Sequence, residues 1–143
     1  MDKMELMKEA VARKDELTED EQCVHFGALC YDIQISDKEL WREYSKSLIG
    51  SKVQERCTRD LTTEELEVYR IDTPDWREHW RWYTDLRALV WESRQDPVAN
   101  VIKLIVPKEH VLLYWNDSEN AIIDINFVEQ AEGHRIAYYK RRY

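Results

Sequence analysis

The residues best suited to acid–base chemistry lie in the last third of the chain, where apolar and polar residues alternate as in β-strands. His110 begins one apolar segment, Asp124 stands between two isoleucines of the next, and Glu119 lies in the turn between them. If these segments pair as antiparallel strands, the three side chains converge on one face and could transfer protons to and from a substrate. One hypothesis is therefore a small hydrolase or transferase that uses Asp124 and His110. The alternative is a solvent-facing strand whose polar residues alternate with core residues.

Signatures of other catalytic and cofactor sites are missing from the sequence. The chain has only 3 glycines, too few for a glycine-rich loop that holds a phosphate or a dinucleotide. Cys23, His25 and Cys30 are close in sequence but lack the paired spacing of zinc ligands. We therefore expect no metal and no cofactor, while a Cys–His pair that forms only in space stays open.

The distribution of charge favours a protein partner over nucleic acid. A net charge of −8 disfavours binding to a phosphate backbone. No basic residue occurs between Lys14 and Lys38, whereas acids are frequent there. The acids that we expect to contact a basic partner are Asp15, Glu16, Glu19, Asp20 and Glu21. A solvated acidic surface without a partner is the alternative.

These observations favour a binding protein over an enzyme. The chain has 6 tryptophans and 8 tyrosines, residue types that contribute strongly to protein interfaces. We expect a small acidic protein-binding module that contacts neither nucleic acid nor membrane directly. By composition, it fits an inhibitor of a nucleic-acid-handling enzyme, of the viral counter-defence or antitoxin type.

Length and composition are typical of one soluble domain. The 143 residues are enough for a single core, and we expect one α+β domain over 1–143. There is no run of about 18 apolar residues and no apolar segment of the secretion-signal type at the N-terminus. The 3 cysteines include no Cys-x-x-Cys pair, which argues for a reducing compartment. We therefore expect a cytoplasmic protein.

The central element that must position these residues is predicted to be a helix over residues 73–95, which carries four of the 6 tryptophans. Thr73 can cap this helix, Pro74 suits its first position, and Pro97 ends it. At about 100° per residue its apolar residues cover more than half of the circumference, which predicts cover on two sides.

Two residues of this predicted helix are candidates for contact with a partner. Trp82 points to one flank of the apolar arc, and Arg87 lies within it. Tryptophan and arginine are frequent at the centre of interfaces. We therefore expect a protein partner or a second copy of the chain to cover this side, which includes a homo-oligomer among the predictions.

Four further helices are predicted before this element. Residues 2–16 form a loose apolar stripe, and three Ser/Thr-x-x-Glu capping boxes follow it. These boxes are Thr18 to Glu21, Ser36 to Glu39 and Thr62 to Glu65. The second box begins a helix over 37–58 with a break at Gly50, and the third begins a short helix that ends near residue 70. Residues 23–33 have helical spacing, but a buried strand stays open there because Gly27 weakens a helix by about 1 kcal/mol.

After Pro97 the sequence changes to short segments rich in β-branched and aromatic residues. These segments are residues 101–106, 110–115, 121–128 and 135–140, and turn-forming residues separate them. They predict an antiparallel meander of about four strands. The predicted fold is therefore α+β, with about four or five N-terminal helices followed by a small C-terminal antiparallel sheet.

Overall fold

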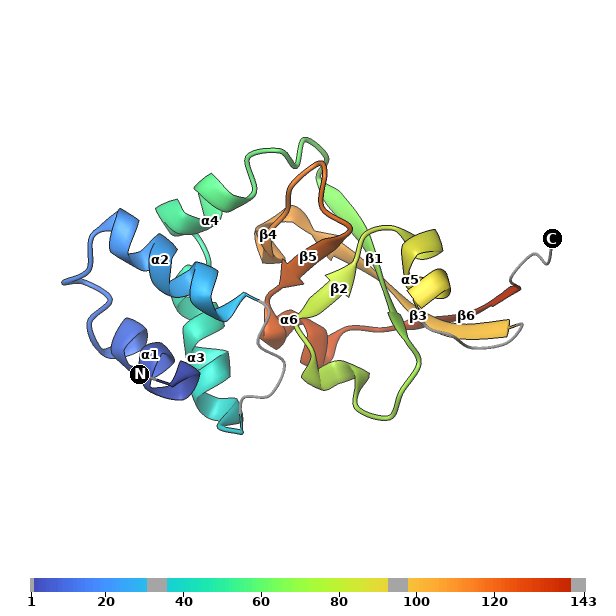
Figure 1. Cartoon of the computed structure of the whole chain (residues 1–143), viewed down its shortest axis with the longest axis horizontal. Helices are drawn as coiled ribbons and strands as arrows, with labels where there is room; N and C mark the ends of the chain where they lie inside the picture. The colour runs from blue at the N-terminus through green and yellow to red at the C-terminus, as the bar shows by residue number, and fades with distance from the viewer. Residues whose placement is uncertain (1, 31–35, 93–97, 140–143) are drawn as a thin grey trace.

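The computed structural model describes residues 2–30, 36–92 and 98–139 and has an α+β fold (Figure 1). Its sheet is antiparallel and has six strands in the order β4-β5-β2-β1-β3-β6, two more than predicted. The helices are interspersed among the strands instead of lying only before them. The strands are β1 (Glu65–Ile71), β2 (Arg81–Tyr83), β3 (Val98–Pro107), β4 (Val111–Leu113), β5 (Asn120–Ile123) and β6 (His134–Tyr139). The helices are α1 (Lys3–Ala12), α2 (Glu19–Leu29), α3 (Lys38–Leu48), α4 (Lys52–Cys57), α5 (Leu86–Glu92) and α6 (Ile125–Gln130), with 3-10 turns η1 (Trp76–Glu78) and η2 (Lys108–His110).

The N-terminal helices follow the prediction closely. Thr18 and Glu21 form the expected capping box, in which each side chain accepts a hydrogen bond from the backbone N–H of the other residue. The helical alternative is confirmed for the described part of segment 23–33, which α2 contains up to Leu29; residues 31–33 lie outside the described residues. Asp37, not Ser36, caps α3. The predicted break at Gly50 is confirmed, with φ 74°, a backbone conformation that favours glycine.

The short helix predicted to begin at the third capping box was wrong, because the segment after Thr62 is a strand. β1 pairs along its length with β3, from Glu65 opposite Pro107 to Ile71 opposite Val101. This long-range pairing overrides the local Thr-x-x-Glu pattern, since β-propensity depends mainly on neighbouring strands. Val68 consequently lies in the core at the centre of the sheet.

The helix predicted over residues 73–95 was also wrong. That segment forms η1, β2 and α5 in turn, and residues 93–95 lie outside the described residues. Thr73 bonds to the Asp75 carboxylate instead of capping an α-helix. Trp80 and Trp82, two residues apart, are each 0% exposed, because the period of a strand places both on one face. The predicted helix had a wide apolar arc because residues that alternate with the two-residue period of a strand were placed on a helical projection.

The predicted C-terminal meander is partly correct. β3, β4 and β6 overlap three of the predicted segments, but the segment 121–128 divides into β5 and α6. Asp124 causes the change, because its Oδ1 accepts a hydrogen bond from Asn126 N and caps α6. Residue 140 lies outside the described residues.

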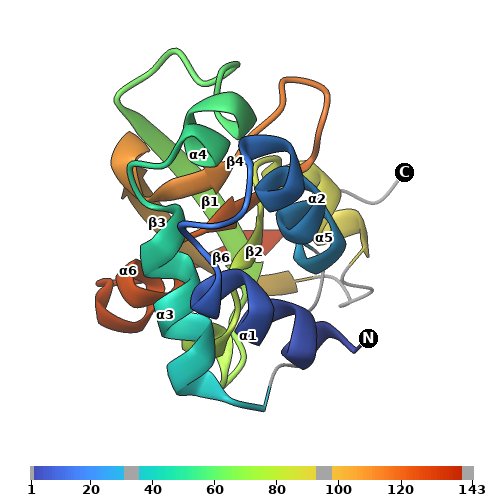
Figure 2. The ribbon, with the colours of Figure 1, turned by 90° about the vertical axis from the view of Figure 1, so that its left-hand side faces the viewer.

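The core lies between helices α1 to α4 and the sheet, with the helices in front of the strands in Figure 2. Trp80 is at its centre, with ring centroids 5.4 Å from Trp41, 6.3 Å from Tyr44 and 6.3 Å from Phe26. A smaller apolar cluster of Leu89, Val90 and Val101 joins α5 to the other face of the sheet. No described helix has the length and apolar character needed to span a membrane.

An ion pair joins the helical layer to α6. The guanidinium of Arg42 on α3 donates to both carboxylate oxygens of Glu129 on α6, with the shortest bond at 2.7 Å. These bonds hold the pKa of Glu129 below its usual value. They fix α6, and with it the segment that leads into β6.

Two glycines provide a matched test of this packing. A Cβ on Gly133 would lie 2.9 Å from Ile102 Cγ2 and 3.0 Å from the Trp76 ring, whereas a Cβ on Gly27 in α2 would meet nothing within 4 Å. We expect Gly133→Ala to lower the free energy of unfolding by about 1 to 3 kcal/mol through overpacking. Gly27→Ala should raise it by up to about 1 kcal/mol through helix propensity. Urea denaturation of both variants checks this, and a stabilised Gly133→Ala protein would contradict the described packing.

Candidate functional site

The structure brings together His110 and Asp124 but not Glu119. His110 Nδ1 lies 3.0 Å from Asp124 Oδ2, and because a carboxylate only accepts, Nδ1 carries the proton of this bond. The His110 side chain is 32% exposed and that of Asp124 is 5% exposed, so solvent reaches the imidazole but hardly the carboxylate. Glu119 precedes β5 and Asp124 follows it, which places them at opposite ends of the strand.

The contacts of the His110–Asp124 pair also serve the fold. Asp124 Oδ1 caps α6 while Oδ2 receives the imidazole. The His110 ring stacks on Phe127 of α6, with centroids 5.0 Å apart. The pair therefore joins η2 to the start of α6, and its geometry also matches a carboxylate that orients a histidine base.

The five acids predicted to contact a partner form one exposed region at the start of α2. Asp15 and Glu16 lie in the loop before α2, and the other three occupy its first turn. Several already have partners within the chain. Arg56 of α4 lies 3.1 Å from Asp20 and 3.8 Å from Glu19, and Arg13 lies 3.2 Å from Glu16. Such exposed pairs contribute little to stability and exchange readily for other partners.

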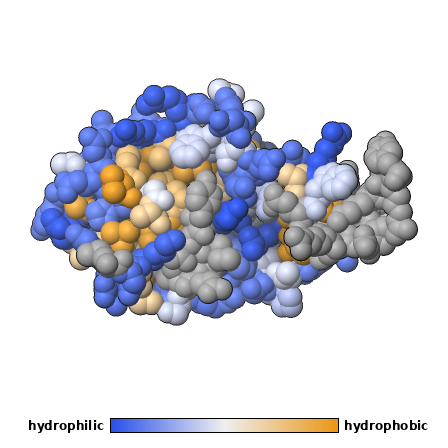
Figure 3. Space-filling view, viewed as in Figure 1, coloured by the Kyte–Doolittle hydropathy of each residue, from blue (hydrophilic) through white to orange (hydrophobic). Residues whose placement is uncertain are grey.

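The outer face of α2 has an apolar centre that the sequence analysis did not identify. Val24 is 72% exposed, and Gly27 and Ala28 beside it are also exposed. Asp20 lies one turn before Val24 on this face. Figure 3 shows apolar residues gathered over α2 and toward the sheet, with hydrophilic residues along the outer edge. The sequence contains a signal for this face, because Val24 and Ala28 lie opposite the buried Phe26 on a helical projection.

The two remaining predicted partner contacts do not join this surface. Trp82 is 0% exposed and packs edge to face on Trp76, with centroids 5.9 Å apart. It cannot touch a partner in this fold, because the strand period turns it into the core. Arg87 is exposed on α5, which lies on the far side of β1 and β2 from α2 in Figure 1. The predicted contacts therefore do not form one surface.

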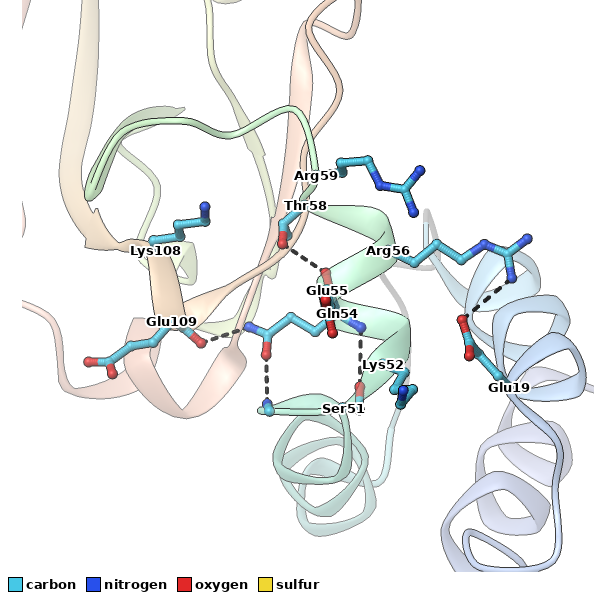
Figure 4. A pocket seen from close by; sticks show the side chains of 11 residues that line it. Glu19, Ser51, Lys52, Gln54, Glu55, Arg56, Thr58, Arg59, Lys108 and Glu109 are labelled. Carbon is cyan, nitrogen blue, oxygen red and sulfur yellow. Dashed lines mark hydrogen bonds and ion pairs between the residues drawn. The ribbon is translucent and has the colours of Figure 1, made fainter.

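A polar cleft lies between α4 and η2 (Figure 4). It has a volume of about 600 Å³. Its charged lining residues are Lys52, Arg56, Arg59, Lys108, Glu19, Glu55 and Glu109. Contact with Asp20 raises the pKa of Arg56 further above its ordinary value. These residues form no local sequence motif that would predict the cleft, because the cleft joins segments about 50 residues apart in the sequence.

The cysteines lie between α2, α4 and the core. Cys23 and Cys57 are half-buried and Cys30 is buried. Burial raises the pKa of the Cys30 thiol to about 12 and raises that of Cys57. Among residues 2–30, 36–92 and 98–139, no three His, Cys, Asp or Glu side chains are grouped so that they could hold a metal ion.

A pair of substitutions tests whether the side-chain contacts of Asp124 stabilise the fold. Asp124→Ala removes both the cap of α6 and the acceptor of His110, and should lower the free energy of unfolding by about 1 to 3 kcal/mol. The exposed Glu119→Ala is the matched control and should change it by less than about 0.5 kcal/mol. Urea denaturation measures both values. Equal losses would show that the Asp124 contacts do not stabilise α6.

Comparison with known proteins leaves these residues without a family context. No protein-family model, no curated protein and no solved structure matches the chain. The assignment of function therefore depends on the contacts, exposure and charges described above.

Proposed function

We propose that this chain is a protein-binding module whose contact surface is the outer face of α2 and the acidic loop before it. The observation that carries the proposal is Val24, a β-branched apolar residue that is 72% exposed on a helix. Burial of such a side chain contributes about 1.5 to 3 kcal/mol. Contact with a partner supplies that burial.

The surroundings of Val24 resemble the anatomy of an interface. Interfaces have an apolar centre and a polar rim. Here Gly27 and Ala28 extend the centre, and Glu19, Asp20 and Glu21 form the rim at the start of the helix. Gly27 lets a partner backbone approach α2 closely, because nothing lies within 4 Å of its missing Cβ.

The partner that fits this surface has a basic rim around an apolar patch. Complementary charge would speed association and exclude acidic surfaces. Enzymes that act on nucleic acid present positive grooves, so an inhibitor of such an enzyme is the partner class that the proposal favours. The net charge of −8 supports this choice, since it repels the nucleic acid itself.

The test begins with retention of a partner from a lysate of the native host and continues with variants of the chain. Val24→Arg should weaken binding at least about tenfold, because it places a charge in the apolar centre. Asp20→Lys should slow association and flatten its salt dependence. Surface plasmon resonance at several salt concentrations measures both effects.

Two exposed positions elsewhere serve as controls. Ile105→Arg on β3 and Glu43→Lys on α3 repeat the same chemical changes, and both wild-type residues are exposed. They should leave affinity and association rate unchanged. Full binding by folded Val24→Arg, or an equal loss in Ile105→Arg, would refute α2 as the contact surface.

A hydrolase or transferase is the second candidate, which the His110–Asp124 contact supports. In this hypothesis Asp124 orients the imidazole and His110 Nε2 acts as the general base. His110→Gln should then lower kcat/KM about a hundredfold on any chromogenic ester or phosphoester that the wild-type chain hydrolyses. Glu119→Gln, at the other end of β5, should leave it unchanged. Absence of turnover across such a panel, or activity that survives in His110→Gln, would count against this candidate.

A further inference from the structure

We infer that the cleft between α4 and η2 is a binding site for a small phosphate-bearing molecule, such as a sugar phosphate or a nucleotide. The cleft adjoins the acidic rim on α2, because Glu19 belongs to both, but its other lining residues come from α4, the turns that flank it and η2. Its volume of about 600 Å³ lies within the range of small-molecule sites, roughly 300 to 1,000 Å³.

The charges around the cleft support an anionic ligand. Of its four cations, Arg56 is neutralised by Glu19 and Asp20. Lys52, Arg59 and Lys108 are exposed and form no ion pair with any residue that the structure describes. Three such cations around one concave surface give a local positive potential there, although the net charge of the chain is −8.

The acids that line the cleft offset this potential only in part. The Glu109 carboxylate points away from α4 in Figure 4, while its backbone carbonyl faces Gln54. Glu19 is engaged with Arg56. Glu55 is then the lining acid with no described ion pair.

The walls of the cleft are held in place by the buried side chain of Gln54. Its Nε2 donates to Glu109 O at 2.7 Å and to Val111 O at 2.9 Å. Its Oε1 accepts from Gly50 N at 2.7 Å. These three bonds tie α4 to η2, to the start of β4 and to the α3–α4 turn, so the cations are presented from a fixed frame.

The lining also indicates the kind of anion. The uncharged lining residues are Gly50, Ser51, Gln54 and Thr58, a polar surface that suits a hydroxyl-rich body better than an apolar one. Two lysines supply separate point charges, a common arrangement for phosphate. A nucleic-acid strand does not fit, because the field of a few cations is screened within about 8 Å and the rest of the acidic chain repels a polyanion.

Titration calorimetry at low ionic strength tests this inference with pyrophosphate and a nucleoside diphosphate as probes. Both should bind saturably to the wild-type chain, and the parent nucleoside should not. The double substitution of Arg59→Ala with Lys108→Ala should weaken pyrophosphate binding at least about tenfold. Glu55→Gln should strengthen pyrophosphate binding, because it removes a negative charge from the lining of the cleft.

The matched control is the double substitution of Lys8→Ala with Lys46→Ala, which removes two exposed cations from α1 and α3. It should leave binding unchanged. Absence of saturable binding, an equal loss in the control, or citrate that binds as tightly as pyrophosphate would overturn the phosphate site. Circular dichroism of each variant confirms that the fold is retained.

Discussion

The packing of Trp80 against three aromatic side chains connects the two halves of this protein. Trp80 lies just before β2, near the middle of the sheet order, while Phe26, Trp41 and Tyr44 come from α2 and α3. Aromatic pairs at these separations add to the burial of their large surfaces. Because this contact sets how α2 and α3 lie on the sheet, it also determines which side of α2 faces outward. The exposure of Val24 is therefore a consequence of the burial of Phe26 on the opposite side.

The residues around Trp80 pack closely, but several of their buried polar atoms lack a hydrogen-bond partner. Among the described residues, Trp41 Nε1, Tyr44 Oη, Ser45 Oγ and Trp80 Nε1 are buried without a hydrogen-bond partner. Each such group opposes folding by about 1 to 3 kcal/mol. The apolar contacts of the same side chains must outweigh this cost, which makes tight packing around Trp80 necessary.

The sequence predicted elements well where local signals decide, and poorly where distant pairing decides. The Thr18–Glu21 box and the break at Gly50 depend on neighbouring backbone groups. β1 and β2 pair with β3 and β5, whose partner residues lie 30 or more positions away, so the Thr62 pattern and the tryptophan spacing were read as helices. The candidate sites differ in the same way in how far the sequence predicts them. The contact between His110 and Asp124 was predicted from two paired strands, but it forms just beyond them, with His110 in η2 and Asp124 at the cap of α6. The cleft depends on a hydrogen-bonded turn that no spacing reveals.

The strand order requires segments that lie far apart in the sequence to meet before the sheet is complete. The inner strands β2 and β1 precede their neighbours β5 and β3 along the chain, and Arg42 meets Glu129 across 87 residues. During synthesis, α1 to α4 leave the ribosome before the sheet that buries them exists. Closing such long loops is slow, so this chain should refold in milliseconds to seconds, in the manner of β-rich proteins despite its helical N-terminus. A nascent chain stopped before β5 would expose the apolar side of its helices, which makes it a substrate for chaperones.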